Sequence, residues 1–117
     1  MDVQYSPEAR KEADQLTHLE RASTLLGAIL GPQSSQQVKA EWDRVQGRPG
    51  RTLYRLIIRD STGEVSTDFA PDELENPLHM RVRLYRLWGD LLQVRNNQQH
   101  EQVQIISGLT TTVSEEH

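Results

Sequence analysis

The spacing of hydrophobic residues predicts a long helix at the start of the chain. Between residues 7 and 30 they recur every three or four positions, which is the spacing of one buried helical stripe. Ser6 suits the cap of this helix and Pro7 its first position. Gly31 and Pro32 mark its end. We therefore predict a first helix over residues 7–30.

The hydrophobic period then shortens to two, which indicates β-strands. Turn-forming residues at 46–50 and 60–63 divide this region into three segments, so we expect an antiparallel three-stranded meander. One choice of register places the apolar side chains of all three strands on a single face. Its expected pairs are Trp42 with Tyr54, Ala40 with Leu56, Val38 with Ile58, Ile58 with Val65, Leu56 with Thr67 and Tyr54 with Phe69.

Charged residues occupy the opposite face of the expected sheet. In the same register Glu41 lies beside Arg55, and Arg55 lies beside Asp68. Arg59 lies beside Glu64. Opposite charges in cross-strand positions stabilise strand pairing. We therefore predict a polar outer face on which Arg55 points away from the core.

A second helix is predicted from Pro77 onward. Asn76 and Pro77 repeat the order of a capping residue followed by proline. Apolar residues over 78–94 then fill an arc of roughly 200° on a helix, about twice the stripe of a usual surface helix. A hairpin is the alternative, because apolar residues and arginines also alternate over 80–84 and Gly89 favours a turn. The length and the cap favour the helix.

The segment after residue 95 leaves two alternatives. The polar tract 96–102 interrupts the apolar stripe, which resumes within 103–109 if the helix continues. A break at the start of the tract, followed by a fourth strand, is the other possibility. We favour a helix that continues or resumes and ends before Gly108, followed by a disordered tail at 110–117.

These elements together predict one α+β domain with the order α-β-β-β-α. The expected architecture is a three-stranded antiparallel meander with two long helices packed on one face. A chain of 117 residues is long enough for one hydrophobic core. We assign residues 1–5 to a flexible N-terminus, residues 6–109 to the domain and residues 110–117 to the tail.

Composition narrows the classes of function. The formal net charge of −4 gives no general attraction to nucleic acid or anionic lipid. The chain has no cysteine, which excludes disulfides and thiolate chemistry and fits a reducing compartment. The first residues lack the features of a signal peptide, and no apolar run approaches the roughly 18 residues of a membrane span. We expect a cytoplasmic protein without a membrane partner.

The string Asp60-Ser61-Thr62-Gly63 is the most suggestive one for catalysis. Aspartic proteases present their catalytic carboxylate from a loop of the form Asp-Thr/Ser-Gly, but one extra residue spoils the match here. A hairpin turn in which Gly63 takes a positive φ is the interpretation that we prefer. The four histidines include no pair at the helical spacing of metal ligands, and no phosphate-binding motif is present. We therefore predict no catalytic residue, no metal ligand and no cofactor.

Nine arginines between residues 44 and 95 raise the possibility of nucleic-acid binding. The helix, three strands and helix also resemble the double-stranded-RNA-binding domain in element order, which implies RNA binding. That domain begins its second helix with lysines, whereas this chain has the acidic stretch 72–76 there. Arg55 and Arg59 also have carboxylate neighbours in the expected register. A nucleic-acid-associated protein that uses the edge from Arg44 to Arg59 is therefore our second hypothesis, and a small enzyme with an unrecognised site is the third.

The wide apolar arc of the second helix favours a protein that binds another protein. The sheet can cover only one side of such a helix, so the first helix or a partner must cover the other. A helix that continues past residue 96 also overhangs the sheet. Our first hypothesis is a non-enzymatic interaction or assembly module that self-associates, as a homodimer or with another protein. The expected partner-binding residues are Tyr85, Trp88, Val103 and Ile106.

Overall fold

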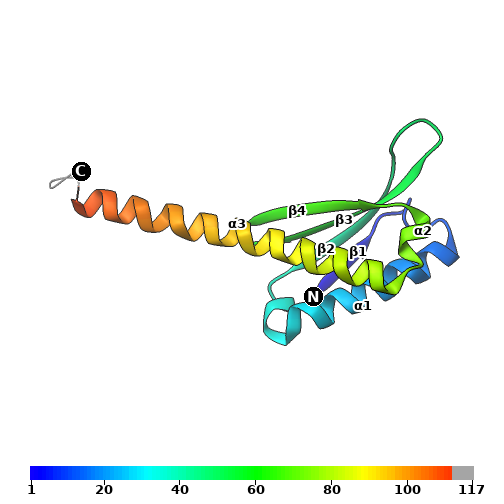
Figure 1. The fold of residues 1–117 in the computed structure, drawn as a ribbon, viewed down its shortest axis with the longest axis horizontal. Coiled ribbons are helices and arrows are strands. Elements are labelled where there is room, and N and C mark those ends of the chain that lie inside the picture. Colours follow the sequence, from blue (N-terminus) through cyan, green and yellow to red (C-terminus); the bar gives the residue numbers. More distant parts are fainter. Residues whose placement is uncertain (112–117) are drawn as a thin grey trace.

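The computed structural model describes the backbone of residues 1–111 and the side chains of residues 1–98. The elements are β1 (Asp2–Tyr5), α1 (Ala13–Ser35), β2 (Lys39–Gln46), β3 (Thr52–Asp60), β4 (Gly63–Phe69), α2 (Pro71–Leu74) and α3 (Pro77–Thr111). The four strands form one sheet in the order β1-β2-β3-β4. Helices α1 and α3 lie on one side of this sheet (Figure 1). The predicted α+β class is confirmed.

The sheet has one strand more than the sequence predicts and is mixed. Residues Asp2–Tyr5, for which we expected a flexible N-terminus, form β1 and pair in parallel with β2. The N–H of Ser6 continues this pairing by donating to the carbonyl of Trp42 at 2.9 Å. Helix α1 connects the two strands, and a helical crossover returns the chain parallel to the strand that it left. The prediction of a purely antiparallel, three-stranded sheet was therefore wrong.

The start of α1 also differs from the prediction. Ser6 does act as a local cap, because its Oγ accepts the N–H of Ala9 at 3.1 Å. This turn ends at Glu12, whose extended backbone (φ −110°, ψ 114°) separates it from the helix that begins at Ala13. The pairing of Ser6 with β2 anchors the segment, so the predicted helix start at residue 7 is an isolated turn.

The predicted end of the first helix coincides with a break inside α1. Gly31 has φ 82° and ψ 167°, which is not helical, and a further short helical segment containing Pro32 follows it. A positive φ of this size is readily adopted only by glycine. The Gly31-Pro32 signal therefore marks a sharp change of direction rather than the end of all helical structure.

The hairpin between β2 and β3 has the predicted core face but a register shifted by two residues. Ala40 pairs with Ile58 rather than with Leu56, and Trp42 pairs with Leu56. The turn explains the shift, because the N–H of Arg51 donates to the carbonyl of Arg48 at 2.9 Å. Its central residues are Pro49 and Gly50, and Gly50 has φ 78°, as in a type II turn. Because side chains alternate, a shift of two leaves each one on its predicted face.

The hairpin between β3 and β4 has the predicted register. Its pairs include Ile58 with Val65, Leu56 with Thr67, and Tyr54 with Phe69. Asp60 pairs with Gly63, so Ser61 and Thr62 form a two-residue turn. The string that resembles a protease loop is therefore a hairpin turn.

The outer face of the sheet is charged as predicted, with one change of partner. Arg55 forms an ion pair with Asp68 at 2.8 Å, and Arg59 lies 3.7 Å from Glu64. Glu41 pairs with Arg59 at 3.2 Å instead of lying beside Arg55. The shifted register of β2 causes this difference, and it places Asp43 opposite Arg55.

The hydrophobic core lies between the inner face of the sheet and the two long helices. Its aromatic centre consists of Trp42, Tyr54 and Phe69, all fully buried. One polar residue, Ser23 of α1, is buried with them. The Trp42 indole N–H donates to Ser23 Oγ at 2.8 Å, and that hydroxyl donates to the carbonyl of Leu19 at 2.9 Å. This serine fixes the position of α1 against β2.

Helix α3 begins where the sequence predicts, and the hairpin alternative is wrong. Asn76 Oδ1 accepts the N–H of His79 at 3.1 Å, which caps the first turn. The helix continues through the polar tract to Thr111, so the predicted end before Gly108 was wrong as well. It extends well beyond the sheet toward the C-terminus (Figure 1). The rest of the expected tail, residues 112–117, lies outside the described residues.

Candidate interaction surface

The Asp60 carboxylate is held by a structural network. Its side chain is only 3% exposed, and its Oδ2 accepts a hydrogen bond from Arg95 of α3 at 2.7 Å. Its Oδ1 accepts the N–H of Thr62 at 2.8 Å and also the Thr62 hydroxyl. Burial raises the pKa of Asp60, but these bonds outweigh it and hold the pKa below the ordinary 3.8. The network ties the β3–β4 turn to α3.

A second network surrounds Glu73 between α2 and α3. Glu73 Oε2 lies 2.8 Å from His79 Nε2 and accepts a hydrogen bond from Arg83 at 2.9 Å. Arg83 also donates to the carbonyl of Asp68 at 2.8 Å and lies over the Phe69 ring. Burial raises the pKa of Glu73. Its hydrogen bonds and the nearby Arg83 charge lower the pKa by more than burial raises it, so the net shift is downward. This network holds the start of α3 against β4.

A polar hollow at the start of α1 is the feature nearest to an acid–base site. It has a volume of about 400 Å³, and its lining includes Asp14, His18 and Glu75. Asp14 and Glu75 are exposed to solvent. Among the residues whose side chains the structure describes, no group of three or more histidine, aspartate or glutamate residues could hold a metal ion. This hollow gives no specific support to the enzyme hypothesis.

The arginine-rich strands are largely neutralised by carboxylates. Arg44 lies 3.2 Å from Glu12, and Arg55 and Arg59 have the partners on the outer sheet face given above. The remaining arginines of the predicted edge, Arg48 and Arg51, are exposed to solvent in the loop between β2 and β3. Nucleic-acid binding requires lysines or arginines that are available to neutralise phosphates and so release the counterions condensed on the nucleic acid. The arrangement therefore favours a structural role for most of this edge.

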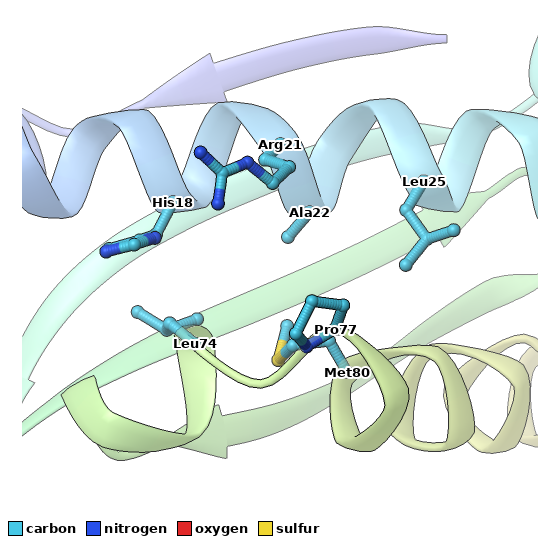
Figure 2. A pocket seen from close by; sticks show the side chains of 7 residues that line it. All are labelled: His18, Arg21, Ala22, Leu25, Leu74, Pro77 and Met80. Atoms are coloured by element: carbon cyan, nitrogen blue, oxygen red, sulfur yellow. The ribbon is translucent and has the colours of Figure 1, made fainter.

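An apolar cleft separates α1 from the junction of α2 and α3. Figure 2 shows Leu74, Pro77 and Met80 facing Ala22 and Leu25 across it, with His18 and Arg21 also lining it. Its volume of about 40 Å³ holds only a few water molecules. Pockets for small organic ligands measure roughly 300–1,000 Å³. The cleft is therefore a packing gap rather than a ligand site.

The most conspicuous surface feature is an apolar stripe on the solvent side of α3. Leu78 is 77% exposed, Val82 58% and Tyr85 50%. Their spacing of four and three residues places all three on one face of the helix. We call them the outer stripe of α3. The opposite face of α3 packs into the core, and the residues that do so are Met80, Leu84, Leu87 and Leu91.

The four predicted partner-binding residues have different positions in the structure. Tyr85 belongs to the outer stripe, whereas Trp88 is half-buried, packs against the core and lies beneath the Arg95 guanidinium. Val103 and Ile106 lie on the helical backbone of α3, but their side chains are outside the described residues.

Leu78 and Val82, the two most exposed members of the outer stripe, are not among the partner-binding residues predicted from the sequence. Leu78 is one of the apolar residues in the predicted arc over 78–94. Val82 was considered only in the hairpin alternative over 80–84. The signal that identifies them is their regular spacing of four and three residues with Tyr85.

The comparisons with known proteins add no family to this description. The chain matches no protein family, and neither the curated proteins nor the solved structures provide a match. Within the described part of the chain, none of the helices is both long and apolar enough to cross a membrane. The function must therefore be argued from the surface itself.

Proposed function

We propose that this chain is a non-enzymatic protein–protein interaction module that self-associates through the solvent side of α3. The observation that carries the proposal is the outer stripe, in which three large apolar side chains are at least half exposed on adjacent helical turns. Single exposed apolar residues are normal on a protein surface, but a contiguous apolar patch usually marks an interface. The cytoplasmic homodimer expected from the sequence is part of this proposal.

The packing of α3 within its own domain supports the need for a partner. Its inner face contacts β4 and α1, and Arg83 and Arg95 fasten it to the sheet side of the molecule. These contacts fix the rotation of the helix about its axis. Because the rotation is fixed, the outer stripe cannot turn inward to bury its side chains. Association with another molecule is the remaining way to remove them from water.

Light scattering on a sizing column tests this proposal. The full chain should have about twice the mass of 13.4 kDa expected for one chain. Val82→Glu introduces a charge into the outer stripe and should shift the mass toward that of one chain. Ala28→Glu is the matched control, because Ala28 is an exposed helical residue on α1. A single-chain mass at every accessible concentration, or equal behaviour of both variants, would contradict the proposal.

A further inference from the structure

The outer stripe is the beginning of a much longer pattern on α3. Starting from Leu78, positions spaced alternately by four and three residues follow a stripe that drifts by only about 20° per seven residues around the helix. The residues at these positions are Leu78, Val82, Tyr85, Gly89, Leu92, Asn96, Gln99, Val103 and Ile106. We call this set the outer seam. Alternating spacings of four and three are the heptad repeat of coiled coils, in which one helix packs along another.

The second half of the outer seam lies on a part of α3 that extends past its own domain. The contacts of α3 with the sheet reach Val94, which lies against Gly63, and Arg95, which bonds to Asp60. The helix then continues for 16 residues to Thr111, which is about 24 Å at 1.5 Å per residue. We call residues 96–111 the α3 extension. It passes beyond the end of the sheet (Figure 1).

We propose that the outer seam binds the outer seam of a second copy of this chain, with the two α3 helices antiparallel. The α3 extension of each copy then lies along the outer stripe of the other. This inference rests on the proposed function and specifies its partner and geometry. In the antiparallel arrangement each folded domain lies beside the extension of the other copy. The two domains are therefore at opposite ends of the helix pair and do not collide.

One antiparallel register sets apolar residues of the partner against both Val82 and Tyr85. In antiparallel coiled coils an a position of one helix faces a d position of the other, and this rule restricts the possible pairs. One permitted register sets Val82 against the partner's Ile106 and Tyr85 against the partner's Val103. Its central layers set Gly89 against the partner's Gln99 and Leu92 against the partner's Asn96. The apolar layers thus form at both ends of the overlap.

The two registers shifted by seven residues cover the outer stripe less well. Shifted one way, Leu92 would face the partner's Val103 and Asn96 the partner's Gln99, but Val82 would lie beyond the partner's Thr111, the last residue of α3. Shifted the other way, Val82 would face the partner's Gln99 and Tyr85 the partner's Asn96. This second shift would then leave Ile106 beyond the start of the partner's helix, which begins at Pro77. The proposed register is therefore the one that covers both Val82 and Tyr85 with apolar residues of the partner.

Charge complementarity favours the antiparallel orientation over the parallel one. Residues 77–95 contain four arginines and one aspartate, whereas residues 96–111 of the same helix contain one glutamate and no lysine or arginine. An antiparallel pair places the arginine-rich half of each helix beside the half of the other that has no lysine or arginine. A parallel pair would place the arginine-rich halves together, and like charges across an interface oppose association.

Cysteine cross-linking of the full chain tests the orientation, because the chain contains no native cysteine. The variants are Val82→Cys, at a position that is 58% exposed, and Ile106→Cys, each as a single substitution. An equal mixture of the two variants under mild oxidation should give a disulfide-linked dimer. Val82→Cys alone should remain uncross-linked, because antiparallel helices keep its two copies far apart. Tyr85→Cys mixed with Val103→Cys should behave in the same way, and Ala28→Cys is the control for random collision.

The outcomes separate this inference from the proposed function when the mass is measured by light scattering on the same samples. A dimeric mass with cross-linking only in the two mixtures supports both. A dimeric mass with cross-linking of Val82→Cys to itself establishes a parallel dimer, which overturns this inference and leaves the proposed function intact. A dimeric mass without cross-linking in either mixture overturns the register. A single-chain mass overturns both proposals.

Discussion

Replacement of Ser23 by alanine tests how a buried hydroxyl group holds the two layers of the fold together. The Ser23 hydroxyl accepts the indole N–H of Trp42 at 2.8 Å and the hydroxyl of Tyr5 at 3.2 Å. Trp42 is 1% exposed, so water cannot replace the serine as its acceptor. Ser23→Ala keeps the β-carbon and removes only the oxygen. The variant therefore isolates the hydrogen bonds from the packing.

The expected loss of stability follows from two opposing contributions. A buried donor left without a partner costs about 1–3 kcal/mol. Alanine is a better helix former than serine, which returns roughly 0.5 kcal/mol in the middle of α1. Tyr5 is half-buried, so its hydroxyl can bond to water instead and adds little. We expect Ser23→Ala to lower the free energy of unfolding by about 1–2 kcal/mol.

Urea denaturation followed by circular dichroism measures this change at one fixed protein concentration, because self-association adds to apparent stability. Thr24→Ala is the matched control. The Thr24 hydroxyl donates to the carbonyl of Glu20 at 3.1 Å, as the Ser23 hydroxyl does to Leu19, but Thr24 is exposed. Its replacement should change stability by less than about 0.5 kcal/mol.

A double-mutant cycle with Trp42→Phe identifies the partner. Phenylalanine has no indole N–H, so Ser23→Ala should cost about 1 kcal/mol less in that background than in the wild type. Equal stability of the wild type and Ser23→Ala would refute the reasoning. An undiminished cost in the Trp42→Phe background would show that the Trp42 bond is not the origin of the effect.

Three further substitutions have expected outcomes in the same assay. Gly63→Ala should cost about 1–3 kcal/mol, because its φ is +155° and the added β-carbon would lie 2.8 Å from Val94 Cγ1; an unchanged midpoint would argue against this close approach. Asp60→Asn should destabilise the chain more at pH 7 than at pH 3, since a carboxylate with a lowered pKa contributes stability above its unfolded pKa and loses it as the pH falls through the folded value. A cost that does not depend on pH would contradict the lowered pKa. Arg83→Met should cost about 1–3 kcal/mol because it leaves partly buried acceptors without their donor. Arg86→Met at an exposed site should change little, and similar effects of the two substitutions would contradict the network.

The parts of the fold that could be predicted are those determined by residues close together in the sequence. The alternation of apolar and polar residues in β3 and β4, together with a turn closed by Gly63, was enough to predict how the two strands pair. Asn76 and Pro77 located the start of α3. In contrast, β1 has only four residues and is stabilised by its pairing with β2, which lies more than 30 residues away. A strand that depends on such a distant partner leaves little trace in its own sequence.

The candidate surface was predictable only in part for a similar reason. The wide apolar arc of α3 indicated that one neighbour could not cover it, and Tyr85 was selected on that basis. Which side of the arc remains exposed depends on the rotation of α3, and that rotation is fixed by tertiary contacts such as Arg83 with β4. Trp88 therefore packs against the core, while Leu78 and Val82 face solvent.

The charged residues on the outer face of the sheet show how a single turn can change the predicted ion-pair partners. The alternation of residues in β2 identified which side chains face outward, and the structure agrees. The partners of Glu41 and Arg55 nevertheless changed, because the turn at Pro49 and Gly50 shifted β2 by two residues. Faces follow from alternation alone, whereas partners also require the turn geometry.

Hydrogen exchange of the backbone amides at increasing protein concentration is the sharpest test of self-association through α3. An unsupported helical segment as short as the α3 extension is marginally stable in water, so its amides should exchange rapidly in a single chain. If a second copy covers the extension, exchange in residues 99–111 should slow as concentration rises through the micromolar range. Protection of the core helix α1 should change much less over the same range. Exchange in residues 99–111 that is independent of concentration, with a single-chain mass throughout, would contradict self-association through α3.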